Sequence, residues 1–192
     1  MLLQIQSGAF DFTTPVIRLG DICHNLSQVN RYLGSTDCTW SVAEHSILCY
    51  WLAKTDKVDP DLLLPILLHD AHEYILGDAN GVYKKLLGEW YHQTITRLDA
   101  AVAKKFGFSP VLFQAEPIRT FDEMALYIES KVFFKNRVDA LWTYYDEKYS
   151  TSPTAISWIE NLTTWRANLS MRKSPSEIAL DLKDLIIAEL AQ

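Results

Sequence analysis

Apolar residues recur every three to four positions through most of the chain, and this period predicts helices rather than strands. Only residues 1–16 differ, because the runs LLQIQ and AFDF predict one or two short strands that end at Pro15. The pattern therefore predicts an all-α fold with a short N-terminal β segment. The expected helices cover about 21–33, 41–54, 59–77, 82–87, 90–106, 120–145, 156–169 and 174–190.

Local residue types predict where several of these helices begin and end. Ser41-Val-Ala-Glu44 and Ser174-Pro-Ser-Glu177 both have the form of a capping box, in which Ser and Glu satisfy each other's backbone N–H groups. Asp59-Pro60 combines an N-cap acid with a proline in the first turn, and Pro65 then either kinks that helix or restarts it. The glycines that follow apolar runs predict helix stops at Gly34, Gly77 and Gly107.

Size and charge limit the classes of protein to consider. The chain has 192 residues, a net charge of -6 and no long apolar run, so we expect one domain over 1–192, without a membrane span or a signal peptide. This charge would repel a nucleic-acid polymer, whereas a small anion could bind if a bound cation reversed the local field. Three cysteines without a CxxC pair predict reduced thiols and a cytoplasmic location.

One buried segment carries a dense group of titratable residues. LLLPILL is apolar on every side and should lie in the middle of the bundle, yet it leads directly into His69-Asp70-Ala-His72-Glu73. Because residues four apart share a helix face, we expect His69 and Glu73 to point together, with Asp70 beside them. Burying these groups would cost on the order of several kcal/mol unless they were paired or bound to a metal ion.

Two other helices offer partners for this group on their inward faces. His45 shares a face with Cys49, and Asp122 lies in line with Glu129 on an apolar stripe. Each residue alone has an ordinary structural explanation, as a hydrogen-bonded core histidine or as a helix acid favoured by the dipole. Taken together, two imidazoles and two carboxylates suit a divalent transition metal. The candidate ligands are His45, His69, Asp70 and Asp122.

Other catalytic motifs fit the sequence less well. A zincin needs two histidines four positions apart, whereas His69 and His72 are three apart. The chain has no GxGxxG motif and no Walker A loop. A Ser-His-Asp or Cys-His site stays open, although no Ser or Cys lies in a recognisable nucleophile elbow.

The order of the candidate ligands resembles the H…HD…D signature of the HD-domain phosphohydrolase superfamily. Within that superfamily, TWSVAEHS and LLHDAHEYILGD are similar to YfbR-type 5'-deoxynucleotidases, while SGAFDF and NRYLG are similar to phage DatZ-type dATP triphosphohydrolases. The resemblance covers about residues 5–130. It implies an HD-domain helical bundle, a homo-oligomer (a dimer or a hexamer) and, if the chain is phage-encoded, a location in the host cell cytoplasm. It also implies a transition metal such as Zn, Co or Mn, and leaves open a second ion such as Mg.

The same resemblance assigns roles to individual residues. The family's metal ligands fall on His45, His69, Asp70 and Asp122. Its catalytic acids fall on Glu73 and Asp78, of which Asp78 also lies near the sugar and a second metal. Its substrate-binding residues fall on Arg31, Tyr32, Asp78 and Lys84. From the residues alone, Arg31 lies opposite the apolar stripe of its helix, so an ordinary helix-end charge is the alternative explanation.

These roles imply hydrolysis of a small-molecule deoxynucleotide, with cleavage of dATP to deoxyadenosine and triphosphate preferred. The alternatives are a 5'-deoxynucleotidase acting on monophosphates, a non-catalytic nucleotide-binding HD module, and an HD enzyme for a cyclic nucleotide or an alarmone. The loop after Asp78 is usually rich in proline in the family, but here it reads Ala-Asn-Gly-Val-Tyr. Base specificity therefore rests on analogy.

Overall fold

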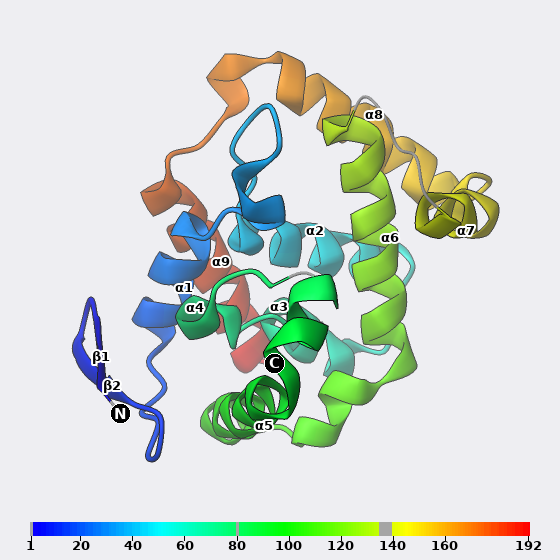
Figure 1. The fold of residues 1–192 in the computed structure, drawn as a ribbon. Coiled ribbons are helices and arrows are strands. Elements are labelled where there is room, and N and C mark those ends of the chain that lie inside the picture. Colours follow the sequence, from blue (N-terminus) through cyan, green and yellow to red (C-terminus); the bar gives the residue numbers. More distant parts are fainter. Residues whose placement is uncertain (1, 80, 135–139) are drawn as a thin grey trace.

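The computed structural model describes residues 2–79, 81–134 and 140–192. It is an assembly of helices with one small antiparallel hairpin near the N-terminus (Figure 1), which confirms the predicted all-α fold with a short β segment. The hairpin strands are β1 Leu2–Ile5 and β2 Gly8–Asp11, and Leu2 pairs with Asp11.

The helices follow in chain order. The α-helices are α1 Leu19–Gln28, α2 Val42–Thr55, α3 Leu63–Leu68, α4 Glu73–Leu76, α5 Gly81–Phe106, α6 Glu116–Phe133, α7 Ala140–Tyr149, α8 Pro153–Ala167 and α9 Pro175–Leu190. Short 3-10 segments are η1 Arg31–Gly34, η2 Pro60–Leu62, η3 Pro110–Gln114 and η4 Leu169–Met171. None of the helices within these described stretches is both long enough and apolar enough to cross a bilayer.

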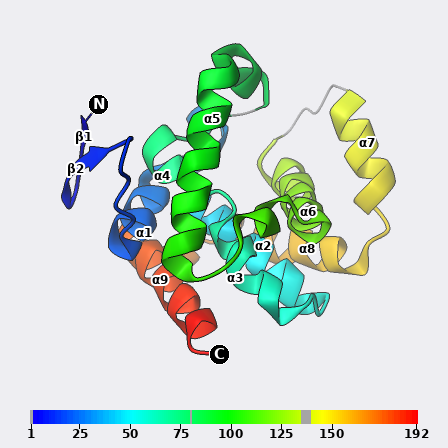
Figure 2. The ribbon, with the colours of Figure 1, turned by 90° about the horizontal axis from the view of Figure 1, so that it is seen from below.

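Helix α2 lies at the centre and contacts α1, α3, α6 and α9. Figure 1 shows it between α1 on one side and α6 on the other, and Figure 2 shows the molecule from below, with α5 running across the other helices. Since neighbours surround it, α2 is buried on most sides and needs no polar stripe. His45, in its first turns, is therefore completely buried.

The predicted capping box at the start of α2 is present. Glu44 N donates to Ser41 Oγ at 3.2 Å, and Ser41 N donates to Glu44 Oε2 at 2.7 Å. The predicted box of Ser174 and Glu177 likewise opens α9. An N-cap of this kind stabilises a helix by about 1 kcal/mol. It also fixes where α2 begins and hence which way His45 points.

The first predicted helix is wrong at its end, because α1 stops at Gln28 rather than near residue 33. The chain then pairs with the segment that enters α2. Val42 N donates to Val29 O at 2.9 Å, and Arg31 N donates to Trp40 O at 2.8 Å. These tertiary hydrogen bonds replace the ones that a longer helix would have made, so the helical period no longer decides where Arg31 points.

The third predicted helix consists of η2, α3 and α4, joined by tight turns. Pro65 lies in the first turn of α3, where its missing N–H leaves no helical bond unmade, so the helix restarts there rather than kinks. Between α3 and α4, Ala71 N donates to Leu68 O and Glu73 N donates to Asp70 O, both three residues back. Three residues per turn bring Asp70 and Glu73 to the same side, where their ligand atoms lie within 4.8 Å of each other.

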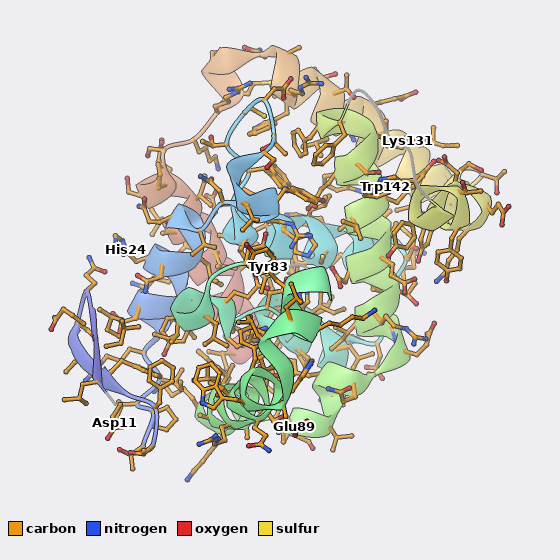
Figure 3. The ribbon with its side chains drawn as sticks, in the orientation of Figure 1. Asp11, His24, Tyr83, Glu89, Lys131 and Trp142 are labelled. Atoms are coloured by element: carbon orange, nitrogen blue, oxygen red, sulfur yellow. The ribbon has the colours of Figure 1, made fainter. Side chains whose placement is uncertain are left out.

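Two further helix predictions need correction or refinement. The helix expected over 120–145 ends at Phe133, and α7 begins at Ala140, while residues 135–139 of that prediction lie outside the described part. Figure 3 shows Lys131 of α6 and Trp142 of α7 at the same edge of the molecule, where Lys131 pairs with Asp146. Helix α5 breaks at Gly88, whose φ of 68° favours glycine, and this agrees with the predicted gap between 82–87 and 90–106.

Candidate metal centre

The four predicted ligands meet from three parts of the chain: α2, the turn after α3, and α6. His45 Nε2 lies 3.1 Å from Asp122 Oδ1 and 3.6 Å from Asp70 Oδ2. His69 Nε2 lies 3.2 Å from Asp70 Oδ2 and 3.9 Å from Asp122 Oδ1. Two ligand atoms roughly 2.1 Å from one ion are about 3.0–3.4 Å apart at octahedral or tetrahedral angles. The separations of 3.1 and 3.2 Å lie in this range and those of 3.6 and 3.9 Å exceed it, so small shifts of the side chains would let one small cation contact all four groups.

The Nδ1 atom of each imidazole, which faces away from the two carboxylates, has a hydrogen-bond acceptor of its own. His45 Nδ1 lies 2.7 Å from Glu129 Oε1, and His69 Nδ1 lies 2.8 Å from Ile66 O. These acceptors assign one N–H to Nδ1, so in a neutral ring the lone pair of Nε2 would face the carboxylates. His69 Nε2 is buried and has no hydrogen-bond partner among the described residues. Metal-ligating histidines characteristically donate their second nitrogen to a carboxylate or a carbonyl in this way.

The electrostatics of the cluster favour a bound cation. Burial lowers the pKa of the His69 imidazole, but the Asp70 carboxylate outweighs burial and raises this pKa to about 9. Burial raises the pKa of Asp70, but His69 and His45 outweigh it and hold this pKa well below its usual range. The carboxylates therefore draw positive charge onto the imidazoles, and a divalent ion bound to the neutral rings would satisfy the same field.

The cluster opens to solvent on the α6 side. The Asp122 side chain is 43% exposed, whereas the His45 side chain is fully buried. A small anionic substrate could therefore approach from Asp122, while the imidazoles stay fixed in the interior.

Glu129 of α6 supports the cluster from behind, a role that the sequence analysis did not assign. The side chain is fully buried. Its Oε1 accepts hydrogen bonds from Trp40 Nε1 at 2.8 Å and from His45 Nδ1 at 2.7 Å. Its Oε2 accepts from Arg31 Nε at 3.1 Å and from Tyr32 Oη at 2.5 Å. Burial raises the pKa of this carboxyl, but Arg31 and His45 outweigh burial and lower the pKa to about 2.

Arg31 is buried inside the site, so the expectation that it lies away from the apolar stripe is wrong. It is only 8% exposed. Besides the bond to Glu129, its Nη1 lies 3.6 Å from Asp70 Oδ2. The reason is the early end of α1, since Arg31 follows the helix and turns inward with the segment that pairs with Trp40. The guanidinium thus balances two carboxylates, one of them a candidate metal ligand.

Tyr32 and Asp78 are joined through the backbone. Tyr32 and Leu33 both have left-handed backbone angles, with φ of 57° and 54°. Such a conformation costs a residue with a side chain about 1–2 kcal/mol. Asp78 Oδ2 accepts a hydrogen bond from Tyr32 N at 2.8 Å, which holds this segment in place. Asp78 therefore has a structural role beside the role near the sugar that the resemblance implies.

Glu73 lies beside Asp70 at the edge of the cluster. Its side chain is almost entirely buried, its Oε1 is 3.7 Å from Lys84 Nζ, and its Oε2 lacks a hydrogen-bond partner within the described residues. Burial and the Asp70 carboxylate raise the pKa of Glu73 well above its ordinary value. Asp70, His72 and Glu73 have ligand atoms within 4.8 Å of one another and form a second group that could hold a metal ion. His72 Nδ1 in turn lies 3.0 Å from Asp99 Oδ1.

Lys84 lies at the start of α5 and is partly exposed, with 31% of its side chain accessible. In Figure 3 the preceding residue, Tyr83, projects over the middle of the molecule. An ammonium group here is free to meet a phosphate from solvent while it remains near Glu73. The structure thus brings all the predicted site residues into one region, although Arg31 and Tyr32 are held by Glu129.

A separate cavity of about 420 Å³ lies between α2, α8 and α9. Its lining is mainly apolar, and Trp40 forms part of the wall while its Nε1 donates to Glu129 on the other side. The cavity offers little to bind a phosphate, so the titratable cluster is the better candidate site. Four tryptophans line the cavity: Trp40, Trp51, Trp158 and Trp165.

Comparison with known proteins adds relatives but no activity. No family model matches the chain. Uncharacterized protein RCAP_rcc00048 of Rhodobacter capsulatus is 42% identical over 106 residues, which are 52% of this chain and 53% of that protein. Uncharacterized protein YfdR of Escherichia coli (strain K12) is 30% identical over 115 residues, 60% of each chain. The chain thus spans between about half and three fifths of the length of these curated relatives.

Proposed function

We propose that the protein is a metal-dependent phosphohydrolase of the HD-domain superfamily that acts on deoxynucleotides, with dATP as its favoured substrate. The observation that carries this proposal is the convergence of two imidazole Nε2 atoms and two carboxylates at separations of 3.1–3.9 Å. The resemblance in sequence supplies the substrate class. The residues that converge are His45, His69, Asp70 and Asp122.

The donor set favours a divalent transition ion such as Zn, Co or Mn, because it combines imidazole nitrogens with carboxylate oxygens. The buried Nε2 of His69 forms no hydrogen bond within the described residues and has only the Asp70 carboxylate beside it at 3.2 Å, a place that a bound ion would fill. When bound, such an ion would polarise a phosphoryl oxygen and make nearby water more acidic.

Glu73 is the residue best placed to orient and deprotonate the attacking water. Its Oε2 has no partner in the described structure, and Asp70, a candidate ligand, is its neighbour in the second cluster. In the proposed reaction, water attacks the α-phosphorus of dATP and the bond from that phosphorus to the sugar O5' breaks. Glu73 accepts a proton from the water, and O5' gains one as deoxyadenosine leaves with triphosphate.

Two cations offset the charge of the transferring phosphate. Lys84 is partly exposed and can reach substrate, while Arg31 is committed by its Nε to Glu129 and by its Nη1 to Asp70. Fixed donors of this kind stabilise developing negative charge without having to reorganise during the reaction. Lys84 is therefore the stronger candidate for direct phosphate contact, and Arg31 mainly positions the carboxylates of Asp70 and Glu129.

A turnover screen tests the proposal. The purified protein is assayed with the common ribo- and deoxynucleoside triphosphates and with the deoxynucleoside monophosphates, in the presence of cobalt, manganese or magnesium. Release of triphosphate chiefly from dATP supports the proposal, and the Asp70→Ala variant should abolish it. Phosphate released only from monophosphates would favour the 5'-deoxynucleotidase alternative. Binding without turnover of any of these nucleotides would favour the non-catalytic module.

A further inference from the structure

Cys49 lies one helical turn after His45 on α2 and faces the same interior cluster. Its Sγ is 3.5 Å from His45 Nε2, the nitrogen that also faces Asp70 and Asp122. The ligand atoms of His45, Cys49 and His69 all lie within 4.8 Å of one another. The residue is 1% exposed, so its sulfur borders the space between the imidazoles rather than solvent.

The separation matches what a shared ion would require. An ion held at usual zinc distances from a nitrogen and a sulfur separates these two atoms by roughly 3.5 Å at the tetrahedral angle. A second observation points to the same place, because the His69 side chain is 8% exposed and its Nε2 has no hydrogen-bond partner in the described structure. The Cys49 sulfur and an imidazole nitrogen that forms no hydrogen bond therefore lie within 4.8 Å of each other beside His45.

We propose that Cys49 is a thiolate ligand of the ion held by His45 and His69, and that it gives the centre a preference for thiophilic divalent ions. This inference rests on the proposed metal centre. When the ion binds, the thiol loses its proton to solvent and the sulfur forms the bond to the ion. A soft thiolate favours zinc, cobalt and cadmium over magnesium and manganese.

The competing explanation is an ordinary buried thiol. Cys49 Sγ also lies 3.8 Å from Phe121 O, a long and weak hydrogen bond. In this explanation the ion binds His45 Nε2 but not the sulfur, so the nitrogen can no longer accept a hydrogen bond from the thiol. The Phe121 carbonyl would then be the thiol's acceptor. Cys23 and Cys38 provide matched comparisons, because both are buried free thiols and neither belongs to a potential metal-binding group in the described residues.

The test is cobalt substitution in the intact protein. Bound cobalt reports a sulfur ligand through a near-ultraviolet charge-transfer band. We expect this band in the wild type and in Cys23→Ser, and we expect Cys49→Ser to lack it while it still binds cobalt. Cadmium affinity should fall about tenfold or more in Cys49→Ser, whereas manganese affinity should change little.

Two results would overturn the proposal in distinguishable ways. Wild-type protein that binds cobalt without the charge-transfer band would show that sulfur is not a ligand, and the imidazole and carboxylate centre would stand. Wild-type protein that binds no cobalt would remove the metal centre and this proposal together. The wild-type spectrum decides the question even if Cys49→Ser does not fold.

Discussion

Replacing Glu129 with glutamine should weaken both the fold and the metal centre. The carboxylate has four donors, two on each oxygen: Trp40 and His45 on Oε1, and Arg31 and Tyr32 on Oε2. A glutamine has the same shape, but one of its two positions is an NH₂ group that can only donate. Facing Oε1, the NH₂ group meets the Trp40 and His45 N–H donors; facing Oε2, it meets the Arg31 N–H donor and the Tyr32 hydroxyl, which can turn to accept. Either orientation therefore sets at least one N–H donor against another in a fully buried place.

The size of the effect follows from these contacts. A buried donor left without an acceptor costs about 1–3 kcal/mol. Removing one member of a buried ion pair costs about 3–5 kcal/mol. Since both descriptions concern the same atoms and do not add, we expect Glu129→Gln to lose about 3–5 kcal/mol of the free energy of unfolding. The amide also weakens the support of His45 Nδ1, so metal affinity should fall by about 10–100-fold.

Urea unfolding and metal titration of the two proteins measure these losses, and Glu123→Gln is the matched control. Glu123 lies on the same helix, and its Oε2 accepts hydrogen bonds from both Lys148 Nζ and Tyr149 Oη. The carbonyl oxygen of a glutamine can still accept both of these hydrogen bonds. We expect the control to lose less than about 1 kcal/mol, since its pair lies near the surface. If Glu129→Gln proved as stable as this control and bound metal as tightly as wild type, the role assigned to Glu129 would be refuted.

Three other predictions follow from single residues. Glu73→Gln should keep the bound metal but lose at least about 100-fold in turnover, so a fully active variant would exclude Glu73 as the residue that activates water. Asp78→Ala removes the acceptor of Tyr32 N and should cost about 1–3 kcal/mol in urea unfolding, whereas Asp78→Asn keeps a carbonyl acceptor; equal loss in both would contradict this contact. Burial raises the pKa of the Cys23 thiol to about 12 from its ordinary 9.0. Above pH 9.0 the thiol therefore ionises in the unfolded chain before it does in the folded one, so the stability that the buried thiol contributes below pH 9.0 is lost as the pH rises toward 12. The free energy of unfolding of wild type should therefore fall relative to that of Cys23→Val as the pH is raised above 9.0. Parallel pH profiles of the two proteins would count against a raised pKa for Cys23.

The parts of the fold that depend on local chemistry could be predicted from the sequence. The capping box at Ser41 and the break at Gly88 need only neighbouring residues, and both agree with the structure. The convergence of the four candidate ligands could also be predicted, because their helix positions turn these polar residues toward the interior, where polar residues need partners.

The parts that depend on distant contacts could not be predicted in the same way. Continuing the helical period puts Arg31 opposite the apolar stripe, but the helix ends at Gln28, and hydrogen bonds to the segment before α2 then determine where Arg31 lies. Glu129 interrupts an apolar stripe, which is a usable sign, but all four of its hydrogen-bond partners lie 84 to 98 positions earlier in the chain. Periodicity reports which face a residue occupies, not which residues from other elements meet it there.

The metal content of the purified protein tests the central claim most directly. Elemental analysis should find about one tightly held transition metal per chain, because the ligands come from separate elements that the ion ties together. His69→Ala and Asp70→Ala should lose this metal, and a chelator should lower the melting temperature of wild type. A free ion at about a thousand times its Kd stabilises the folded state by about 4 kcal/mol, so the shift should be readily measured. Protein that carries no metal, takes up none on titration and melts at the same temperature with chelator or added zinc would contradict the assignment of His45, His69, Asp70 and Asp122 as a metal centre.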